Sequence, residues 1–225
     1  MIFVSELFYS VQGEGSLMGV PSVFIRTSGC NLRCKWCDTP YTSWDPEGRH
    51  MTLDDILDWV RGRSTGHTVV TGGEPMIARE IVALTRGLRQ LEQHITIETA
   101  GTVYEPVECD LMSISPKLAN STPDDPSWHD RHEKLRYQPH VLRQLMSEYP
   151  YQLKFVVSNE ADVEEVSKVT AELGAETARV ILMPEGIDEA VLRERSAWLT
   201  EVCKQHGWRF SPRLHILLYG NKRGT

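Results

Sequence analysis

Three cysteines stand close together in the first fifth of the chain and could hold an iron–sulfur cluster. They are Cys30, Cys34 and Cys37, in the segment Cys-Asn-Leu-Arg-Cys-Lys-Trp-Cys, and their spacing is C-x3-C-x2-C. A 4Fe-4S cluster has four irons and is normally held by four cysteine thiolates. Three thiolates leave one iron without a protein ligand, so this spacing predicts a cluster with one iron open to a small molecule.

A zinc site is the alternative for these thiols. Structural zinc normally has four tetrahedral protein ligands, so a second pair of cysteines or histidines should follow at a suitable spacing. No such pair follows, and Cys109 and Cys203 lie far from the triplet and from each other. We therefore favour the cluster, with zinc or incidental thiols as the alternatives, and expect Cys109 and Cys203 to behave as small buried apolar side chains.

The open iron could bind the amino and carboxylate groups of S-adenosylmethionine (SAM). An electron from the cluster could then cleave the sulfonium to a 5'-deoxyadenosyl radical, while the protein orients the cofactor. The segment Gly72-Gly-Glu-Pro75 follows an apolar run, and its two glycines permit a close approach of the backbone to a ligand. Together, the cysteine triplet and this segment resemble the radical-SAM superfamily.

Short apolar runs alternate with amphipathic segments and indicate the elements that would position these residues. The runs are 22–26, 68–71, 95–98, 111–115, 153–157 and 180–183, and each ends in a polar or glycine-bearing turn. Helices are predicted over 53–60, 81–91, 161–173 and 188–206, the first with Thr52 and Asp55 as a capping box. This alternation predicts an α/β fold with a parallel sheet, and an incomplete (β/α) barrel of the radical-SAM type fits it.

Composition points to one domain. The chain has 225 residues, 40% of them hydrophobic, and we expect a single radical-SAM domain over residues 1–225. The 31 acidic residues outnumber the 24 basic ones, which argues against a general nucleic-acid binder. The first residues have no basic flank and reach an acid at Glu6, so we expect no targeting or membrane-spanning segment. Reduced thiols in an untargeted chain suggest the cytoplasm.

Residues 120–138 interrupt the alternation of strands and helices. The segment is polar, contains Asp124, Asp125, His129 and His132, and lacks a sustained apolar face. We expect a polar loop insertion that can include a short helix. Such a loop is either a lid over a site or a solvated connection, and we favour the connection.

Six further motifs extend from residue 11 to the carboxyl terminus. They are Val11-Gln-Gly-Glu-Gly15, Phe24-Ile-Arg-Thr-Ser-Gly-Cys30, Cys37-Asp-Thr39, Ile97-Glu-Thr-Ala-Gly-Thr102, Ser115-Pro-Lys117 and Pro212-Arg-Leu-His215. Together they resemble the 7-carboxy-7-deazaguanine synthase family. The resemblance implies a lyase that contracts 6-carboxy-5,6,7,8-tetrahydropterin to 7-carboxy-7-deazaguanine with loss of ammonia, a step toward queuosine and other deazapurines. It implies that hydrogen is taken from C6 of the pterin and later returned, which regenerates SAM.

The resemblance also implies the roles of individual residues. Because SAM supplies the radical, it names no protein group as the catalytic residue. Cys30, Cys34 and Cys37 would hold the 4Fe-4S cluster, and Thr39 would bind Mg2+. The SAM-binding residues would be Trp36, Cys37, Asp38, Gly73, Glu74, Ser115, Pro116, Lys117, Met183, Pro184, Glu185 and Gly186. The substrate-binding residues would be Val11, Gln12, Gly13, Glu14, Arg26, Thr71, Glu98 and His215.

These residue types suit a carboxylated pterin. Its amino-pyrimidinone edge is rich in N–H donors, which the acceptors of Gln12, Glu14 and Glu98 can meet. Its carboxylate can form a two-point contact with Arg26. Mg2+ binds hard oxygens and often keeps several waters, but the metal role of Thr39 rests on the resemblance alone.

Partners are also expected. An electron donor such as flavodoxin would reduce the cluster, the chain would form a homodimer, and neither nucleic acid nor a membrane would be bound. Some members of the family place their terminal carboxylate in the substrate pocket, which raises the question of where Thr225 lies. Two other functions remain open: a glycyl-radical activating enzyme, which shares the cysteine spacing, and a non-catalytic zinc or iron–sulfur module.

Overall fold

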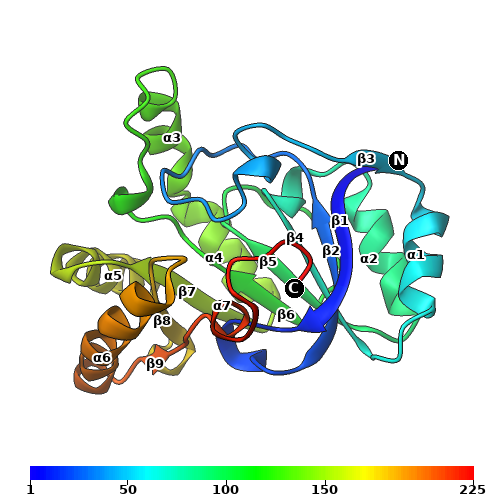
Figure 1. Ribbon diagram of the computed structural model, residues 1–225. Helices are drawn as coiled ribbons and strands as arrows, with labels where there is room; N and C mark the ends of the chain where they lie inside the picture. Colours follow the sequence, from blue (N-terminus) through cyan, green and yellow to red (C-terminus); the bar gives the residue numbers. More distant parts are fainter.

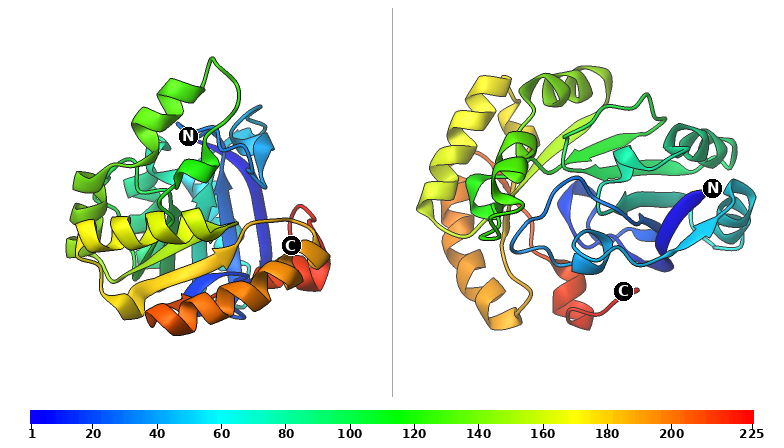
Figure 2. Two further views of the ribbon diagram at one scale, coloured as in Figure 1. Left: turned by 90° about the vertical axis from the view of Figure 1, so that its left-hand side faces the viewer. Right: turned by 90° about the horizontal axis from the view of Figure 1, so that it is seen from above.

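A single curved sheet forms the frame of the protein, as a computed structural model of all 225 residues shows. Its nine strands lie in the order β3-β1-β2-β4-β5-β6-β7-β8-β9. Their bounds are β1 Ile2–Val11, β2 Pro21–Thr27, β3 Arg49–Met51, β4 His67–Gly72, β5 His94–Thr99, β6 Leu111–Ile114, β7 Tyr151–Val157, β8 Val180–Pro184 and β9 Arg209–Phe210. The sheet bends around an open interior with helices along its outer side (Figure 1, Figure 2), so the predicted incomplete α/β barrel is confirmed.

The sheet is parallel from β2 to β9 and antiparallel only at one edge. Each neighbouring pair from β2·β4 to β8·β9 is parallel. In contrast, β1 pairs antiparallel with both β2 and β3. The six predicted strands are all present, whereas β1, β3 and β9 were not predicted. The parallel part brings the carboxyl ends of seven strands to one edge, where ligands gather in such folds.

The helices are α1 Leu53–Arg61, α2 Ile81–Gln90, α3 His129–Arg136, α4 Pro139–Glu148, α5 Glu160–Leu173, α6 Glu189–His206 and α7 Leu214–Tyr219. The predicted capping box of α1 is confirmed, because the amide of Asp55 donates to Thr52 Oγ1 at 3.1 Å and the Asp55 carboxylate accepts from the amide of Thr52. The four predicted helices are present, and α4 and α7 were not predicted. None of the seven helices is both long enough and apolar enough to span a bilayer.

Alternate residues of the strands face the helices and the interior of the barrel. Ile25, Val70 and Ile97 belong to the large core between the sheet and the helices, together with Leu84 and Leu88 of α2. Because side chains alternate along a strand, the residues that follow them point the other way, into the interior. Burial of the side chains that face the helices therefore determines which side chains of the same strands face the interior of the barrel.

The segment over residues 120–138 contains α3 and packs against the loop that carries the cysteines (Figure 1). His132 is fully buried: its Nδ1 accepts from the amide of Arg33 at 3.1 Å, and its Nε2 lies 2.9 Å from Ser121 Oγ. The amide of Lys35 donates to the carbonyl of Ser121 at 3.0 Å. These hydrogen bonds hold the cysteine loop against the segment 120–138.

A second buried histidine lies at the opposite end of the strands. His67 begins β4 and is 4% exposed; its Nδ1 lies 2.6 Å from Ser22 Oγ and its Nε2 lies 2.9 Å from Thr96 Oγ1. The ring of His94 is 4.9 Å away, edge on. Burial, with a smaller contribution from His94, lowers the pKa of His67 to about 4. The folded protein therefore keeps this imidazole neutral at pH values where the unfolded chain protonates it.

We expect the free energy of unfolding to decrease as the pH falls from about 6.5 toward 4, because in that window the unfolded state binds a proton that folded His67 does not. Denaturant unfolding at pH 7 and pH 5 should show a loss that is smaller by about 2 kcal/mol in His67→Gln. The exposed His140→Gln is the control. Equal pH dependence in the wild type and His67→Gln would contradict this assignment.

Candidate functional site

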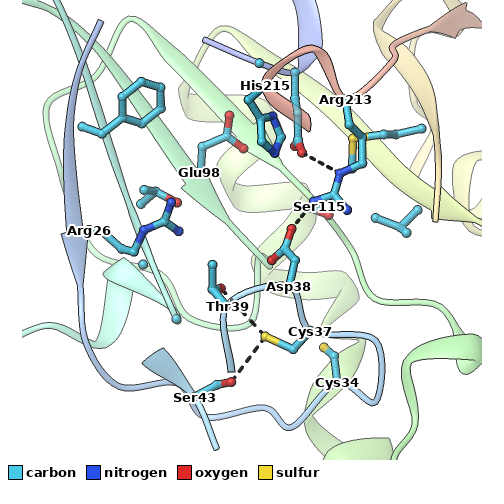
Figure 3. Close-up of a pocket in the computed structure, with 18 of the residues that line it drawn as sticks. Arg26, Cys34, Cys37, Asp38, Thr39, Ser43, Glu98, Ser115, Arg213 and His215 are labelled. Atoms are coloured by element: carbon cyan, nitrogen blue, oxygen red, sulfur yellow. Dashed lines mark hydrogen bonds and ion pairs between the residues drawn. The ribbon is translucent and has the colours of Figure 1, made fainter. Parts of the chain in front are cut away.

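A cavity of about 300 Å³ lies inside the curved sheet, at the carboxyl ends of the strands (Figure 3). The structure brings most of the predicted site residues to its wall. They are Val11, Gln12, Gly13, Glu14, Arg26, Cys30, Cys34, Trp36, Cys37, Asp38, Thr39, Thr71, Gly73, Glu98, Ser115, Lys117, Met183, Glu185, Gly186 and His215. Three predicted residues are not part of the wall: Glu74, Pro116 and Pro184.

Strand alternation explains why the polar side chains gather there. Arg26 follows Ile25 on β2, Thr71 follows Val70 on β4, and Glu98 follows Ile97 on β5. In the parallel register Arg26 lies beside Thr71. Each residue is one position after an outward core residue, so the same packing that buries the core directs these side chains into the cavity.

The cysteines surround one end of the cavity. Cys30 Sγ accepts from the amide of Leu32 at 3.4 Å, and Cys37 Sγ lies 3.4 Å from Ser43 Oγ. Cys34 is buried. Burial is the main cause that raises the pKa of the Cys30 and Cys34 thiols to about 12, so without a metal both are protonated at neutral pH. Metal binding would release these protons.

The arrangement suits a cluster. No group of three or more His, Cys, Asp or Glu side chains converges closely enough to enclose a single metal ion. The three thiolates of a cubane bind three different irons, so they surround a larger volume than the ligands of one ion do. The donors near Cys30 and Cys37 are of the kind that hydrogen-bond to cluster sulfurs. The cysteine loop therefore fits a 4Fe-4S cluster.

Glu74 belongs to the glycine-rich segment, but it is not part of the cavity wall. Its Oε1 accepts from Thr99 Oγ1 at 2.7 Å and from the amide of Met76 at 3.0 Å, and its Oε2 accepts from the amide of Ala100 at 2.8 Å. It is fully buried, and burial raises its pKa although these bonds oppose the shift. In this structure its carboxylate binds the end of β5, and the residues of the segment that line the cavity are Gly72 and Gly73.

The two glycines before it are needed for packing within the chain. A Cβ at Gly73 would lie 2.3 Å from the carbonyl oxygen of Gly29, and one at Gly72 would lie 2.3 Å from Thr27 Oγ1. Gly72 also has φ of +155°, which side-chain-bearing residues rarely adopt. The sequence suggested that these glycines let the backbone approach a ligand closely. In the structure they let it approach Thr27 and Gly29, at and just after the end of β2.

Two cations that sequence analysis did not assign organise the acidic side of the cavity. Lys154 Nζ lies 2.6 Å from Glu14 Oε2 and 2.9 Å from Glu98 Oε2. Arg213 pairs with Glu14 Oε1 at 3.2 Å and with Asp38. Burial would raise the pKa of Glu14, but Lys154, Arg213 and His215 outweigh it and hold the pKa far below its usual range.

A feature of the sequence could have indicated each of these two cations as a site residue. Lys154 is the one charged residue in the otherwise apolar and polar run of β7, all seven residues of which are buried. A lysine there requires acidic partners, because an unpaired buried charge is costly. Arg213 belongs to the motif 212–215, in which only His215 was assigned.

Neutral side chains complete this network. Gln12 Nε2 donates to Glu98 Oε1 at 3.2 Å, and Gln12 Oε1 accepts from the amide of Glu14. His215 packs against Gly13, where a Cβ would lie 2.1 Å from its Nδ1. Burial lowers the pKa of His215. The loop after β1 is thus held against α7 by a contact that requires glycine at position 13.

Arg26 lies across the cavity from this network (Figure 3). Its Nε is 2.8 Å from Glu6 Oε2, and its guanidinium lies 5.4 Å from the centre of the Phe8 ring. Arg223 of the carboxyl-terminal tail lies 3.6 Å from the other oxygen of Glu6. Thr225 is among the residues of the cavity wall, so the end of the chain does reach this site.

Comparisons with known proteins show which families the chain resembles. The family model described as "Radical SAM superfamily" matches residues 24–120. The 7-carboxy-7-deazaguanine synthase of Rhodopirellula baltica is 45% identical over all of this chain and 89% of its own length. The enzyme of that name from Halobacterium salinarum is 43% identical over 99% of this chain and 92% of its own.

Solved structures give the same picture. The crystal structure of QueE from Escherichia coli is 26% identical with a TM-score of 0.71, and the match covers 96% of this chain and 95% of that one. SuiB from Streptococcus suis bound to S-adenosylmethionine is 16% identical with a TM-score of 0.53, over 81% of this chain and 48% of that one. The likeness to SuiB concerns the fold alone.

Replacing Cys34 by Ala should abolish the cluster, because it removes one of the three predicted ligands and leaves only two. After anaerobic reconstitution we expect the iron content and the broad iron–sulfur absorbance to fall to background. Cys109→Ala, outside the cavity wall, should retain both. Wild-type iron content in Cys34→Ala would show that this thiol is not a ligand.

Proposed function

The chain belongs to the 7-carboxy-7-deazaguanine synthase family of the radical-SAM superfamily, and from this premise we propose how its residues hold the cofactors and the substrate. The family activity is that of a lyase that converts 6-carboxy-5,6,7,8-tetrahydropterin to 7-carboxy-7-deazaguanine with release of ammonia, in queuosine and deazapurine biosynthesis. It uses a 4Fe-4S cluster and SAM. The observation that carries the proposal is that the three thiols line the same cavity as an acidic network. This network consists of Glu14, Glu98 and Asp38 with their partners Lys154 and Arg213.

Cys30, Cys34 and Cys37 would hold the cluster at one end of this cavity. When bound, the cluster and SAM supply a 5'-deoxyadenosyl radical that takes hydrogen from the substrate. Lys117 Nζ lies 5.4 Å from the centre of the Trp36 ring and 2.9 Å from Ser115 Oγ. Lys117 therefore connects the cysteine loop with the segment that follows β6. We propose that the cysteine loop, this segment, Gly73 and the turn 183–186 bind SAM.

The acidic network would bind the pterin edge. Each carboxylate oxygen has more than one lone pair, so Glu14 and Glu98 can accept from substrate N–H groups while Lys154 and Arg213 hold them. Gln12 and His215 lie beside them on the same wall. Charge-assisted hydrogen bonds of this kind are stronger than neutral ones, and they would fix the orientation of the ring.

Arg26 would bind the carboxylate of the pterin at the other side of the cavity. Its guanidinium forms an ion pair with Glu6, and Nε has no hydrogen-bond partner within the chain. The remaining N–H groups of the guanidinium can form the two-point contact that a carboxylate accepts. With the acids on one wall and Arg26 on the other, the ring and its carboxylate have separate recognition sites.

Thr39 is proposed as a ligand of Mg2+. Its side chain lies on the cavity wall, directly after Cys37 and Asp38. Mg2+ is commonly held by few protein oxygens together with water and oxygens of the substrate. One hydroxyl therefore fits the metal, provided that the pterin carboxylate and water complete the coordination shell.

Further partners remain proposals. We propose an external one-electron donor such as flavodoxin, because the two cysteines outside the triplet, Cys109 and Cys203, are too few to hold a second cluster of the usual four-cysteine kind. We also propose a homodimer and a cytoplasmic location. A glycyl-radical activating enzyme would act on a protein segment; the buried pairs of Lys154 with Glu14 and Glu98 favour a small polar substrate in its place.

The substrate assignment is tested with pterin that carries deuterium at C6. We expect deuterium in recovered SAM and more product than SAM consumed, because hydrogen returns from deoxyadenosine and SAM is regenerated. Mass spectrometry of SAM and product measures both. SAM loss in proportion to product, without deuterium in SAM, would contradict regeneration. Absence of pterin turnover by protein with a verified cluster would contradict the substrate.

Thr39→Val should raise the Mg2+ concentration for half-maximal rate by about tenfold, because it removes an oxygen ligand without changing the side-chain shape much. Thr39→Ser, which restores the hydroxyl, is the matched control and should recover most of the wild-type value. The measurement is initial rate against Mg2+ concentration. An unchanged requirement in Thr39→Val would remove this residue from the metal site.

A further inference from the structure

Arg213 joins three elements that are far apart in the sequence. It stands between β9 and α7, and its side chain is 7% exposed. Its Nε donates to Glu14 Oε1 at 3.2 Å, its Nη1 donates to the carbonyl of Gly186 at 2.7 Å, and its Nη2 donates to Asp38 Oδ2. Figure 3 shows the side chain directed at Asp38. Each nitrogen of one planar group thus holds a different element.

Under the proposed function these elements have different tasks. Glu14 belongs to the substrate loop between β1 and β2, and Gly186 belongs to the SAM turn after β8. Asp38 directly follows the last cysteine of the cluster loop. Because a guanidinium is rigid and planar, a shift of the SAM turn that moves the Gly186 carbonyl also reorients the N–H that holds Glu14.

The charges make this junction depend on Arg213. Asp38 and Glu14 are both acidic, and both pair with its guanidinium. Without the guanidinium, the cluster loop and the substrate loop would present like charges to each other.

We propose that Arg213 is a positioning residue through which SAM at the Gly186 turn and pterin at Glu14 strengthen each other's binding. Bound SAM holds the turn, the turn orients the guanidinium, and the guanidinium holds Glu14 Oε1 where the pterin edge meets it. Coupling between two binding sites is reciprocal, so the pterin strengthens SAM binding by the same factor. This inference rests on the proposed function.

The test measures the dissociation constant of SAM with and without saturating pterin. The cluster-loaded full chain is used anaerobically and without reductant, so that no turnover occurs. In the wild type we expect pterin to lower the constant at least about fivefold, the lower end of ordinary coupling. In Arg213→Lys, which keeps the charge but lacks the planar fork, the ratio should fall to within about twofold of one. The reverse titration, of pterin with and without SAM, should give the same ratios.

Arg195→Lys is the matched control. Arg195 Nη1 donates to the carbonyl and the carboxylate of Glu185 in the same turn, and its bonds do not extend to Glu14. We expect this variant to weaken SAM binding and to keep the wild-type ratio. A purely structural role of Arg213 would instead change both affinities of its variant and leave the ratio intact.

Several outcomes would overturn the inference. Wild-type protein that binds both ligands without coupling, or Arg213→Lys with the full ratio, would do so and leave the proposed function standing. If Arg213→Lys does not retain iron, Asp38→Asn loosens the guanidinium from the other end and should lower the ratio at least about twofold; an unchanged ratio there overturns the inference. Wild-type protein that does not bind the pterin would overturn the proposed function itself.

Discussion

Burial of alternating charges is the constraint on which the site depends. Glu98, Lys154, Glu14, Arg213 and Asp38 form a row in which every charge is next to the opposite sign. Lys154 and Arg213 are buried, so removal of the acids that pair with either one would leave a buried charge without compensation, which costs about 3–5 kcal/mol. The row crosses β5, β7, the loop after β1, the segment before α7 and the cysteine loop. None of these elements can be displaced alone without exposing a partner of another, so the cavity is assembled as one unit.

Close backbone packing and hydrogen bonds hold the ends of three strands together near the cysteines. Gly72 and Gly73 bring the end of β4 against Thr27, the last residue of β2, and against Gly29, two residues after it. Glu74 then binds the amide of Ala100 at the end of β5. These contacts place the two glycines and the first cysteine on a rigid part of the sheet, which is how binding groups are held in a fixed geometry.

Sequence reasoning reached the elements whose signals are local. The six apolar strands, the four amphipathic helices and the capping box at Thr52 each depend on residues near in sequence, and the structure contains all of them. The motif residues were found by resemblance, and most line one cavity. What the sequence did not indicate is long-range. The sequence predicts that Glu74 binds SAM, and it gives no sign of the bonds to Thr99 and Ala100, which come 25 and 26 residues later. The antiparallel β1 likewise depends on pairing with β2 and β3.

Lys154 shows why the inner face of a parallel sheet is hard to predict and why it matters. Both faces of β7 are buried, so the pattern of apolar residues does not say which face meets the helices and which meets the cavity. Only the fold shows that Lys154 points inward, at Glu14 and Glu98. A closed site that protects a radical must exclude water, and exclusion of water by itself favours the neutral form of a carboxylic acid. Lys154 and Arg213 reverse this for Glu14, whose pKa stays far below neutral. Glu14, which we propose as an acceptor for the pterin, therefore remains ionised in the cavity.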